Sequence, residues 1–261
     1  MKRKNFLQRA YTVMEIRTGF ATGLPVLSGG LFGAYLAGHL KIIPLLLMFV
    51  TGFCLNIVAN VANEIRAYLK SEENEETFTH HLGSEGLVRG DATVVDTLIV
   101  LFFFLGISGL SGITLVFVTK NLTILMIGIL SAFAAIGYSL GPKPYIIYPI
   151  GELVSGLFVG AISTLISAYL QTDHLNLPIV LYSVIPMIMT VFLMSTNNTS
   201  DIEKDRGHRV TLPHVIGFRN SIKLIIPEAL LMLIAWTTLY LIGGITLLMF
   251  ISGVVIFYYF G

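Results

Sequence analysis

Residues 178–206 read PIVLYSVIPMIMTVFLMSTNNTSDIEKDR. The stretch begins as a nearly unbroken apolar run and ends, from Asn197 onward, in amides, carboxylates and basic side chains. A helix of roughly 20 apolar residues is long enough to cross about 30 Å of hydrocarbon. We therefore interpret this stretch as a membrane-spanning helix that ends in a polar segment at the membrane surface.

The rest of the chain repeats this apolar pattern. Its 261 residues are 55% hydrophobic and 12% charged, with a mean hydropathy of +0.82, whereas an ordinary soluble domain carries about 25% charged residues. The composition excludes such a domain and predicts an all-α, polytopic membrane bundle of eight or nine helices around a central cavity. We expect residues 1–261 to form a single domain. The predicted spans are 18–38, 43–68, 92–118, 121–140, 147–171, 178–198, 222–242 and 244–260.

The sixteen Lys and Arg residues are distributed unevenly over the connections between these spans. With eight spans and a cytoplasmic N-terminus, only Lys41 and Lys120 face outward, as the positive-inside rule requires. The two long connections, about 69–91 and 199–221, then lie on the cytoplasmic side. This distribution predicts an integral protein of the cell membrane whose polar segments face the cytoplasm.

Oxygen-bearing side chains recur every four residues at the ends of two spans. Asn197, Asp201 and Asp205 share one helix face, with Asn198 beside them, because positions four apart on a helix are neighbours. Asn56, Asn60 and Asn63 form a second stripe next to Glu64. Charged groups at membrane depth normally face the interior of a bundle. Mg²⁺ prefers oxygen ligands and is usually shared between carboxylates and substrate phosphates, so the two stripes predict a magnesium site.

Basic side chains surround the second stripe. Lys204, Arg206 and Arg209 follow its carboxylates directly, and the planar fork of arginine matches phosphate oxygens. Carboxylates for a metal together with cations for the remaining charge indicate a site for a diphosphate. The alternative is that these bases are ordinary membrane anchors and helix caps.

These segments resemble those of the UbiA superfamily of membrane prenyltransferases, in particular its branch that prenylates 1,4-dihydroxy-2-naphthoate for menaquinone. Residues 197–206 and 209–213 are similar to the second Asp-rich motif of that branch. The other matching segments occur in the family's order: Glu15–Arg17 followed by Pro25, Gly86–Gly90, Gly141–Pro144 and Tyr148–Gly156. The resemblance extends from about residue 15 to residue 220.

The resemblance implies an enzyme that uses Mg²⁺ to bind a polyprenyl diphosphate and transfers the prenyl group to an electron-rich aromatic ring. It implies metal binding by Asp201 and Asp205, with Asn197 and Asn198 as the leading amides of the motif. Lys143 matches a basic residue near the diphosphate, and Tyr138 matches a tyrosine near the reacting carbon. Interfacial anchoring is the alternative role of Tyr138.

The first motif departs from the family pattern N-D-x-x-D. It reads Asn63-Glu64-Ile65-Arg66-Ala67, so Glu64 is a longer ligand and Ala67 cannot ligate. Mg²⁺ demands near-ideal geometry, which weakens this half of the expected site. Glutamates of the following loop are candidates for compensation, namely Glu72, Glu73, Glu75 and Glu76. Asn63 is expected at the diphosphate and Glu64 at the metal.

Glu152 lies near the start of the fifth predicted span. A carboxylate within a membrane span is a functional hypothesis by default. It could orient Lys143 or another polar group, or form a purely structural hydrogen bond.

Three functions remain open for the whole chain. The first is Mg²⁺-dependent prenylation of 1,4-dihydroxy-2-naphthoate from a polyprenyl diphosphate in the lipid bilayer. The second is prenylation of another aromatic or quinone precursor, and the third is an impaired relative that binds isoprenoids. A transporter is disfavoured because the polar residues gather at one membrane face, whereas transport sites lie near the midplane.

Overall fold

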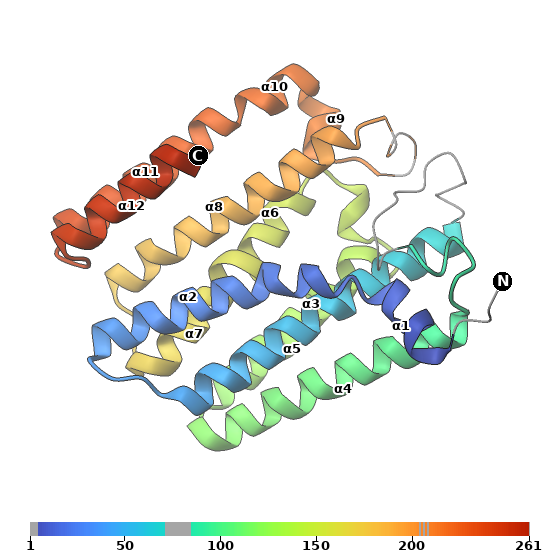
Figure 1. Ribbon diagram of the computed structural model, residues 1–261, viewed down its shortest axis with the longest axis horizontal. Coiled ribbons are helices and arrows are strands. Elements are labelled where there is room, and N and C mark those ends of the chain that lie inside the picture. Colours follow the sequence, from blue (N-terminus) through green and yellow to red (C-terminus); the bar gives the residue numbers. More distant parts are fainter. Residues whose placement is uncertain (1–4, 71–84, 204, 206, 208, 261) are drawn as a thin grey trace. The chain divides into compact units, whose positions relative to one another are not determined.

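The computed structural model describes residues 5–70, 85–203, 205, 207 and 209–260 (Figure 1). Its regular structure is helical, with no strand among these residues. The glutamates of the predicted loop, Glu72 to Glu76, lie outside the described residues, as do Lys204 and Arg206. Contacts divide the chain into two compact units, Met1–Leu24 with Leu46–Tyr148 and Pro25–Leu45 with Pro149–Gly261.

Within the described residues, seven helices are long and apolar enough to cross a membrane, which confirms the all-α membrane fold. They are Ile16–Ala37, Ile42–Lys70, Val94–Thr119, Leu122–Ser139, Gly151–Thr172, Leu177–Ser200 and Phe218–Leu241. A shorter apolar helix covers Leu247–Ile256, where the eighth span was expected. The expectation of one domain over the whole chain stays a prediction.

The first unit holds η1 (Ile16–Thr18), the beginning of α2 (Gly19–Ala37), most of α3 (Ile42–Lys70), α4 (Val94–Thr119), α5 (Leu122–Ser139) and η2 (Tyr145–Ile147). It begins with a short helix that the span count did not anticipate, α1 (Phe6–Met14). Asn5 and Gln8 cap α1 reciprocally, each side chain accepting from the other's backbone N–H.

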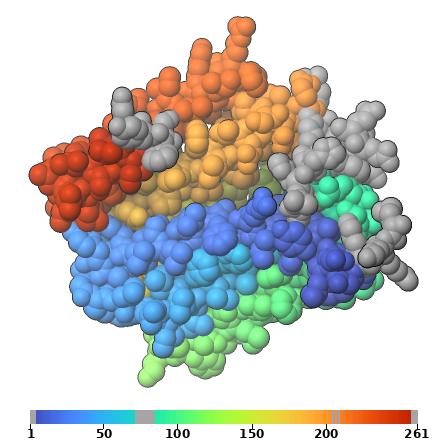
Figure 2. Space-filling model, viewed as in Figure 1, coloured from blue at the N-terminus to red at the C-terminus, as the bar shows by residue number. Residues whose placement is uncertain are grey.

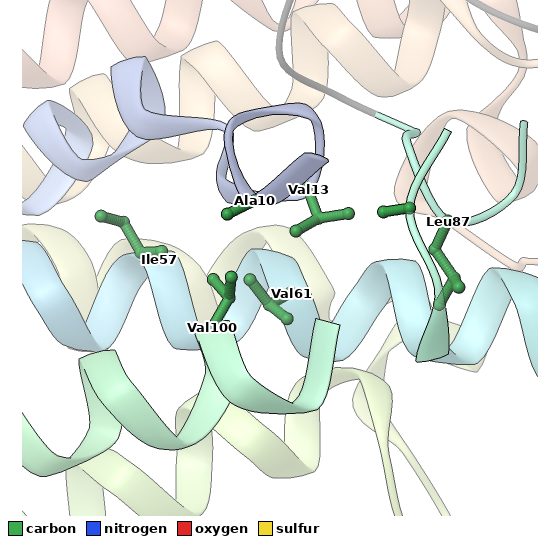
Figure 3. Close-up of a cluster of buried hydrophobic side chains, with 7 residues drawn as sticks. Ala10, Val13, Ile57, Val61, Leu87 and Val100 are labelled. Atoms are coloured by element: carbon green, nitrogen blue, oxygen red, sulfur yellow. The ribbon is translucent and has the colours of Figure 1, made fainter. Parts of the chain in front are cut away.

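The core of this unit forms where α1 covers α3 and α4. Figure 3 shows Ala10 and Val13 of α1 facing Ile57 and Val61 of α3 and Val100 of α4. Val13, Ile57 and Val61 are fully buried. Burying each such side chain stabilises the fold by about 1.5–3 kcal/mol relative to exposure. Apolar packing therefore fixes α1 on the unit that carries the first polar segment, which runs from Asn56 to Glu64 in α3.

An ion pair adds to this contact between α1 and α4. Arg9 donates from Nε to Asp96 Oδ2 at 2.8 Å and from Nη2 to Asp96 Oδ1 at 3.0 Å. Asp96 also accepts from the backbone N–H of Thr93, while its own N–H donates to the Thr93 hydroxyl. Asp96 thus takes part in capping the start of α4 and also binds Arg9 of α1. The hydrogen bond that Arg9 donates to Asp96 raises the pKa of the Arg9 guanidinium.

The second unit contains α6 (Gly151–Ser155), η3 (Gly156–Ile162), α7 (Ser163–Thr172), α8 (Leu177–Ser200), α9 (Leu212–Ile216), α10 (Phe218–Lys223), α11 (Ile225–Leu241) and α12 (Leu247–Phe260). It also contains the rest of α2 from Pro25 onward. Trp236 of α11 donates to the Phe250 carbonyl of α12 at 3.2 Å. Figure 2 shows these two helices gathered in one red region.

Glycines bring α2 into backbone contact with α7 inside this unit. A Cβ on Gly29 would lie 2.5 Å from the Thr164 carbonyl oxygen, and one on Gly33 would lie 2.6 Å from that of Ala168. Ser167 adds a hydrogen bond across the contact, from its Oγ to the Val26 carbonyl at 2.6 Å. Small residues four apart commonly allow such close approach between membrane helices.

The helix that runs from α6 to α7 has a π-helical middle, η3, which packs on α8. A Cβ on Gly160 would lie 2.5 Å from both the Pro186 carbonyl oxygen and the Met187 Cα. π-Helical turns are rare and occur frequently at functional sites. The turn just before η3 carries Glu152, and η3 is held against the helix that leads to the second polar segment.

Candidate functional site

The second polar segment continues the helical path of α8 beyond its last residue. The backbone N–H of Asp201 donates to the Asn197 carbonyl at 3.0 Å, and that of Asp205 donates to Asp201 at 2.8 Å. The N–H of Arg209 donates to Asp205 at 3.1 Å. These i, i+4 bonds carry the face that the spacing predicts from Asn197 through Asp201 to Asp205, although α8 itself ends at Ser200. Gly207, with a positive φ of 88°, then interrupts the helical path before Arg209.

Exposure differs along this face. Asn197 is exposed, Asp201 is half-buried, and Asp205 retains only 5% of its surface. Arg209 Nε lies 3.5 Å from Asp205 Oδ1, so a cation already stands beside the deepest carboxylate. Lys204 and Arg206, which the sequence assigns to the diphosphate, lie outside the described residues.

Asn198 turns away from this face toward a buried carboxylate. Its Nδ2 donates to Glu152 Oε1 at 2.7 Å, and the backbone N–H of Leu212 donates to the same oxygen at 3.0 Å. Glu152 is 2% exposed. Its other oxygen, Oε2, has no hydrogen-bond partner within the part of the chain that the structure describes. The described partners of Glu152 are therefore the polar groups of Asn198 and Leu212.

His214 of α9 contacts the turn that follows α8, and the sequence pattern did not predict this contact. Its Nε2 lies 2.9 Å from the Ile202 carbonyl, and its Nδ1 lies 2.7 Å from the Thr211 hydroxyl. A carbonyl only accepts, so Nε2 carries the proton and Nδ1 accepts from Thr211. The imidazole thereby joins the start of α9 to the turn after α8.

The first polar segment lies in α3, and its amides contact hydroxyl groups. Asn56 Nδ2 donates to the Thr22 hydroxyl at 2.9 Å, and Asn60 donates to the Thr18 hydroxyl. These bonds hold the start of α2 against α3 within the first unit. Asn56 and Asn60 therefore have structural partners, although the stripe was expected to offer oxygen atoms to a metal.

Asn63 and Glu64 complete this segment. The Ser139 hydroxyl donates to Asn63 Oδ1 at 3.3 Å. Glu64, which is 7% exposed, accepts the backbone N–H of Leu87 on Oε1 at 2.5 Å. Arg66 and Ala67 are both buried, at 8% and 4% exposure. The one carboxylate of the first segment thus holds the loop that precedes α4.

Tyr138 and Lys143 lie at the end of α5 and just beyond it. Tyr138 is half-buried in the last turn of α5, next to the Ser139 that donates to Asn63. Lys143 is exposed in the connection to η2. The first unit therefore brings Tyr138 into the neighbourhood of Asn63, while Lys143 stands at the surface of the same connection.

The donor chemistry of the second segment fits a hard cation. Asp201, Asp205 and Asn197 supply carboxylate and amide oxygens from one helical face, the ligand types that Mg²⁺ takes along with water and phosphate. In the described part of the chain, no three His, Cys, Asp or Glu residues lie together as a complete protein cage.

Comparison with known proteins agrees with this chemistry. The chain is 28% identical to the 1,4-dihydroxy-2-naphthoate octaprenyltransferase of Bacillus subtilis (strain 168), over 78% of this chain and 65% of that protein. It is 27% identical to the 1,4-dihydroxy-2-naphthoate octaprenyltransferase of Escherichia coli (strain K12), over 66% of this chain and 57% of that protein. The chain thus matches less than two thirds of the length of these curated relatives.

Solved structures share the fold. A UbiA homologue from Archaeoglobus fulgidus bound to GPP and Mg²⁺ gives a TM-score of 0.72 at 14% identity, covering 96% of this chain and 84% of that one. The apo structure of a UbiA homologue from Aeropyrum pernix K1 gives 0.66 at 17% identity, covering 89% and 81%. The UbiA prenyltransferase family matches residues 24–261. The chain therefore belongs to the UbiA prenyltransferase family.

Proposed function

We propose that this protein transfers a polyprenyl group from polyprenyl diphosphate to an aromatic acceptor, 1,4-dihydroxy-2-naphthoate, on the cytoplasmic side of the membrane. The observation that carries the proposal is the row of Asn197, Asp201 and Asp205 along one helical face, in a chain that belongs to a prenyltransferase family. The acceptor is supported by relatives named as 1,4-dihydroxy-2-naphthoate octaprenyltransferases. The cytoplasmic side is supported by the uneven distribution of Lys and Arg.

Asp201, Asp205 and Asn197 would hold Mg²⁺, and Glu64 of the first segment would complete the set. Bound Mg²⁺ would neutralise charge on the phosphoryl oxygens as a Lewis acid. The basic side chains of the protein would bind the same phosphoryl oxygens. Arg209 stands next to Asp205, where its guanidinium can donate to a phosphate oxygen that approaches the carboxylate. Lys143, Lys204 and Arg206 are the further cations of the proposed diphosphate site.

The remaining residues orient the substrate and protect the reactive carbon. Asn63 and Asn198 supply amide groups near the diphosphate. The allylic C–O bond breaks, and its electron pair leaves with the diphosphate. The aromatic ring forms the new C–C bond and regains its aromaticity by losing the group on the attacked carbon, as a proton or, at the carboxylate position, as CO₂. The ring face of Tyr138 stabilises the positive charge on the allylic carbon by about 0.5–2 kcal/mol, as aromatic faces do for cations.

Product formation tests this function directly. Membranes that contain the protein are incubated with 1,4-dihydroxy-2-naphthoate, radiolabelled polyprenyl diphosphates of several chain lengths, and Mg²⁺. A lipid-soluble prenylated naphthoquinol that disappears when Mg²⁺ is chelated is the expected result. Absence of any prenylated product across all chain lengths would contradict the function. Offering 4-hydroxybenzoate in the same reaction identifies the acceptor, since the preferred ring is consumed first.

A second candidate is an impaired relative that binds isoprenoid diphosphates without efficient turnover. Ala67 favours it, because this residue stands where the family pattern N-D-x-x-D has its second Asp. Arg66 favours it too, because it adds a positive charge next to that position. Both side chains are buried. Turnover comparable to that of a relative with a complete first motif excludes this candidate.

A further inference from the structure

Both ends of the second polar segment are attached to a single oxygen atom. Asn198 stands at its beginning and Leu212 at its end, and both donate to Oε1 of Glu152. The residues between them include Asp201, Asp205 and Arg209. All of these residues belong to the second unit, where α6, α8 and α9 lie together (Figure 1). Glu152 thus closes residues 198–212 into a loop.

Each of the two bonds fixes a group that would otherwise be free to reorient. Asn198 presents its Nδ2 to Glu152 Oε1, and this bond fixes the orientation of the amide. The N–H of Leu212 is the first of α9 and has no partner inside that helix. Glu152 therefore sets the orientation of the Asn198 amide and the position at which α9 begins.

The helix that carries Glu152 is itself held firmly. Gly160 of η3 touches the backbone of Pro186 and Met187 in α8, a contact that leaves no room for a larger side chain. The same α8 leads to Asn197 and Asp201. Glu152 and the segment that it binds are therefore both connected to the packed pair of η3 and α8.

We propose that Glu152 is a positioning residue, which clamps residues 198–212 through Asn198 and Leu212 and thereby holds Asp201 and Asp205 in place for one metal–diphosphate site. This inference rests on the proposed function. Glu152 acts through Asn198 and Leu212 and does not touch the substrate. What it contributes is an acceptor oxygen at Oε1, so the hydrogen-bond geometry matters and the negative charge does not.

Two replacements of Glu152 separate geometry from charge. Glu152→Gln keeps a carbonyl oxygen that can accept from both Asn198 and Leu212, whereas Glu152→Ala removes the acceptor. Residues that orient metal ligands typically change metal affinity by about 10–100-fold when they are lost. Glu152→Ala is therefore expected to weaken metal binding at least about tenfold, and Glu152→Gln to stay within about threefold of the wild type. Glu228→Ala, which removes a buried carboxylate from α11, is the matched control.

The measurement is Mn²⁺ binding, followed by electron paramagnetic resonance in the purified, detergent-solubilised protein with inorganic pyrophosphate present. Thermal unfolding without metal is recorded for each variant, so that loss of folded protein is separated from loss of binding. Asn198→Ala and the double variant Glu152→Ala/Asn198→Ala complete a mutant cycle. Because the two residues act through one contact, the double variant is expected to bind little worse than Glu152→Ala alone.

The outcomes separate the two proposals. A wild type that binds no Mn²⁺ with pyrophosphate contradicts the proposed function, and the clamp with it. A wild type that binds while Glu152→Ala binds equally well contradicts the clamp alone. Glu152→Gln weakened as much as Glu152→Ala would show that the charge is essential, which also overturns the clamp. Full additivity of Glu152→Ala and Asn198→Ala would mean that they act separately, contrary to the proposal.

Discussion

Glu64 and Asp205 are both almost completely buried carboxylates, and each has one contact of a different kind. Glu64 accepts the backbone N–H of Leu87, whereas Asp205 faces the guanidinium of Arg209 one helical turn away. A backbone N–H is a fixed part of the fold, so Glu64 is needed to hold the loop before α4. A side-chain cation can move aside or share its carboxylate with a ligand. The comparison predicts that loss of Glu64 lowers the folding stability more than loss of Asp205 does, and that loss of Asp205 lowers the rate of prenyl transfer more.

The largest effect is expected from the second segment. Asp201→Ala and Asp205→Ala each remove a proposed metal ligand, and metal ions supply several kcal/mol of charge stabilisation in such reactions. Each variant should lose at least about 100-fold in the rate of prenyl transfer, because each 1.36 kcal/mol is a factor of ten. Initial rates are compared at equal amounts of folded protein, as judged by size-exclusion chromatography. If either variant retained the wild-type rate, its carboxylate would not be a metal ligand that prenyl transfer requires.

A smaller effect is expected at Glu64. Glu64→Gln keeps an acceptor for the Leu87 N–H and should lose about tenfold in rate or less, as residues around a metal commonly do. Glu64→Ala leaves a buried N–H unpaired, which costs about 1–3 kcal/mol of folding free energy. The thermal midpoint of the alanine variant should therefore fall while that of the glutamine variant stays close to the wild type. Equal rates for Glu64→Gln and Asp201→Ala would show that both segments bind the ligand equally.

The smallest effect is expected from restoring the family pattern at Ala67. A carboxylate introduced at this buried position is costly unless a cation compensates it. If the first segment faces the metal, Ala67→Asp should lower the Mg²⁺ concentration for half-maximal rate by a few-fold, since added ligand charge tightens binding. Rates are measured over a Mg²⁺ titration, with Ala67→Asn as the uncharged control. An Ala67→Asp protein that is destabilised equally with and without Mg²⁺ would place this position away from any metal.

The spans could be predicted from the sequence because hydrocarbon imposes a simple requirement. Backbone groups in a bilayer must be satisfied within the segment, so an apolar run of sufficient length has to be helical. The stretch expected at 178–198 is the helix Leu177–Ser200, and the one expected at 43–68 is Ile42–Lys70. The i, i+4 steps from Asn197 to Asp205 follow from the same regularity, whereas the turn at Gly207 before Arg209 does not.

The contacts that hold the candidate site depend on tertiary structure and could not be read from spacing. The π-helical turn at Gly156–Ile162 arises where Gly160 meets the backbone of α8, far away in the sequence. Glu152 stands out as a carboxylate in a span, but nothing local shows that Asn198 and Leu212 share its oxygen. Helix α1 is short and carries little hydropathy signal, and its place depends on packing and on Arg9 reaching Asp96.

Photoaffinity labelling tests most directly whether the two segments bind one diphosphate. A prenyl diphosphate analogue with a photoreactive group on its terminal phosphate is bound with Mg²⁺ and irradiated, and the labelled peptides are identified by mass spectrometry. The account predicts label in two peptides, one containing Asn63 and Glu64 and the other containing Asp201 and Asp205, both suppressed by excess unlabelled polyprenyl diphosphate. Label confined to one of the two segments, or label that competitor does not displace, would contradict it.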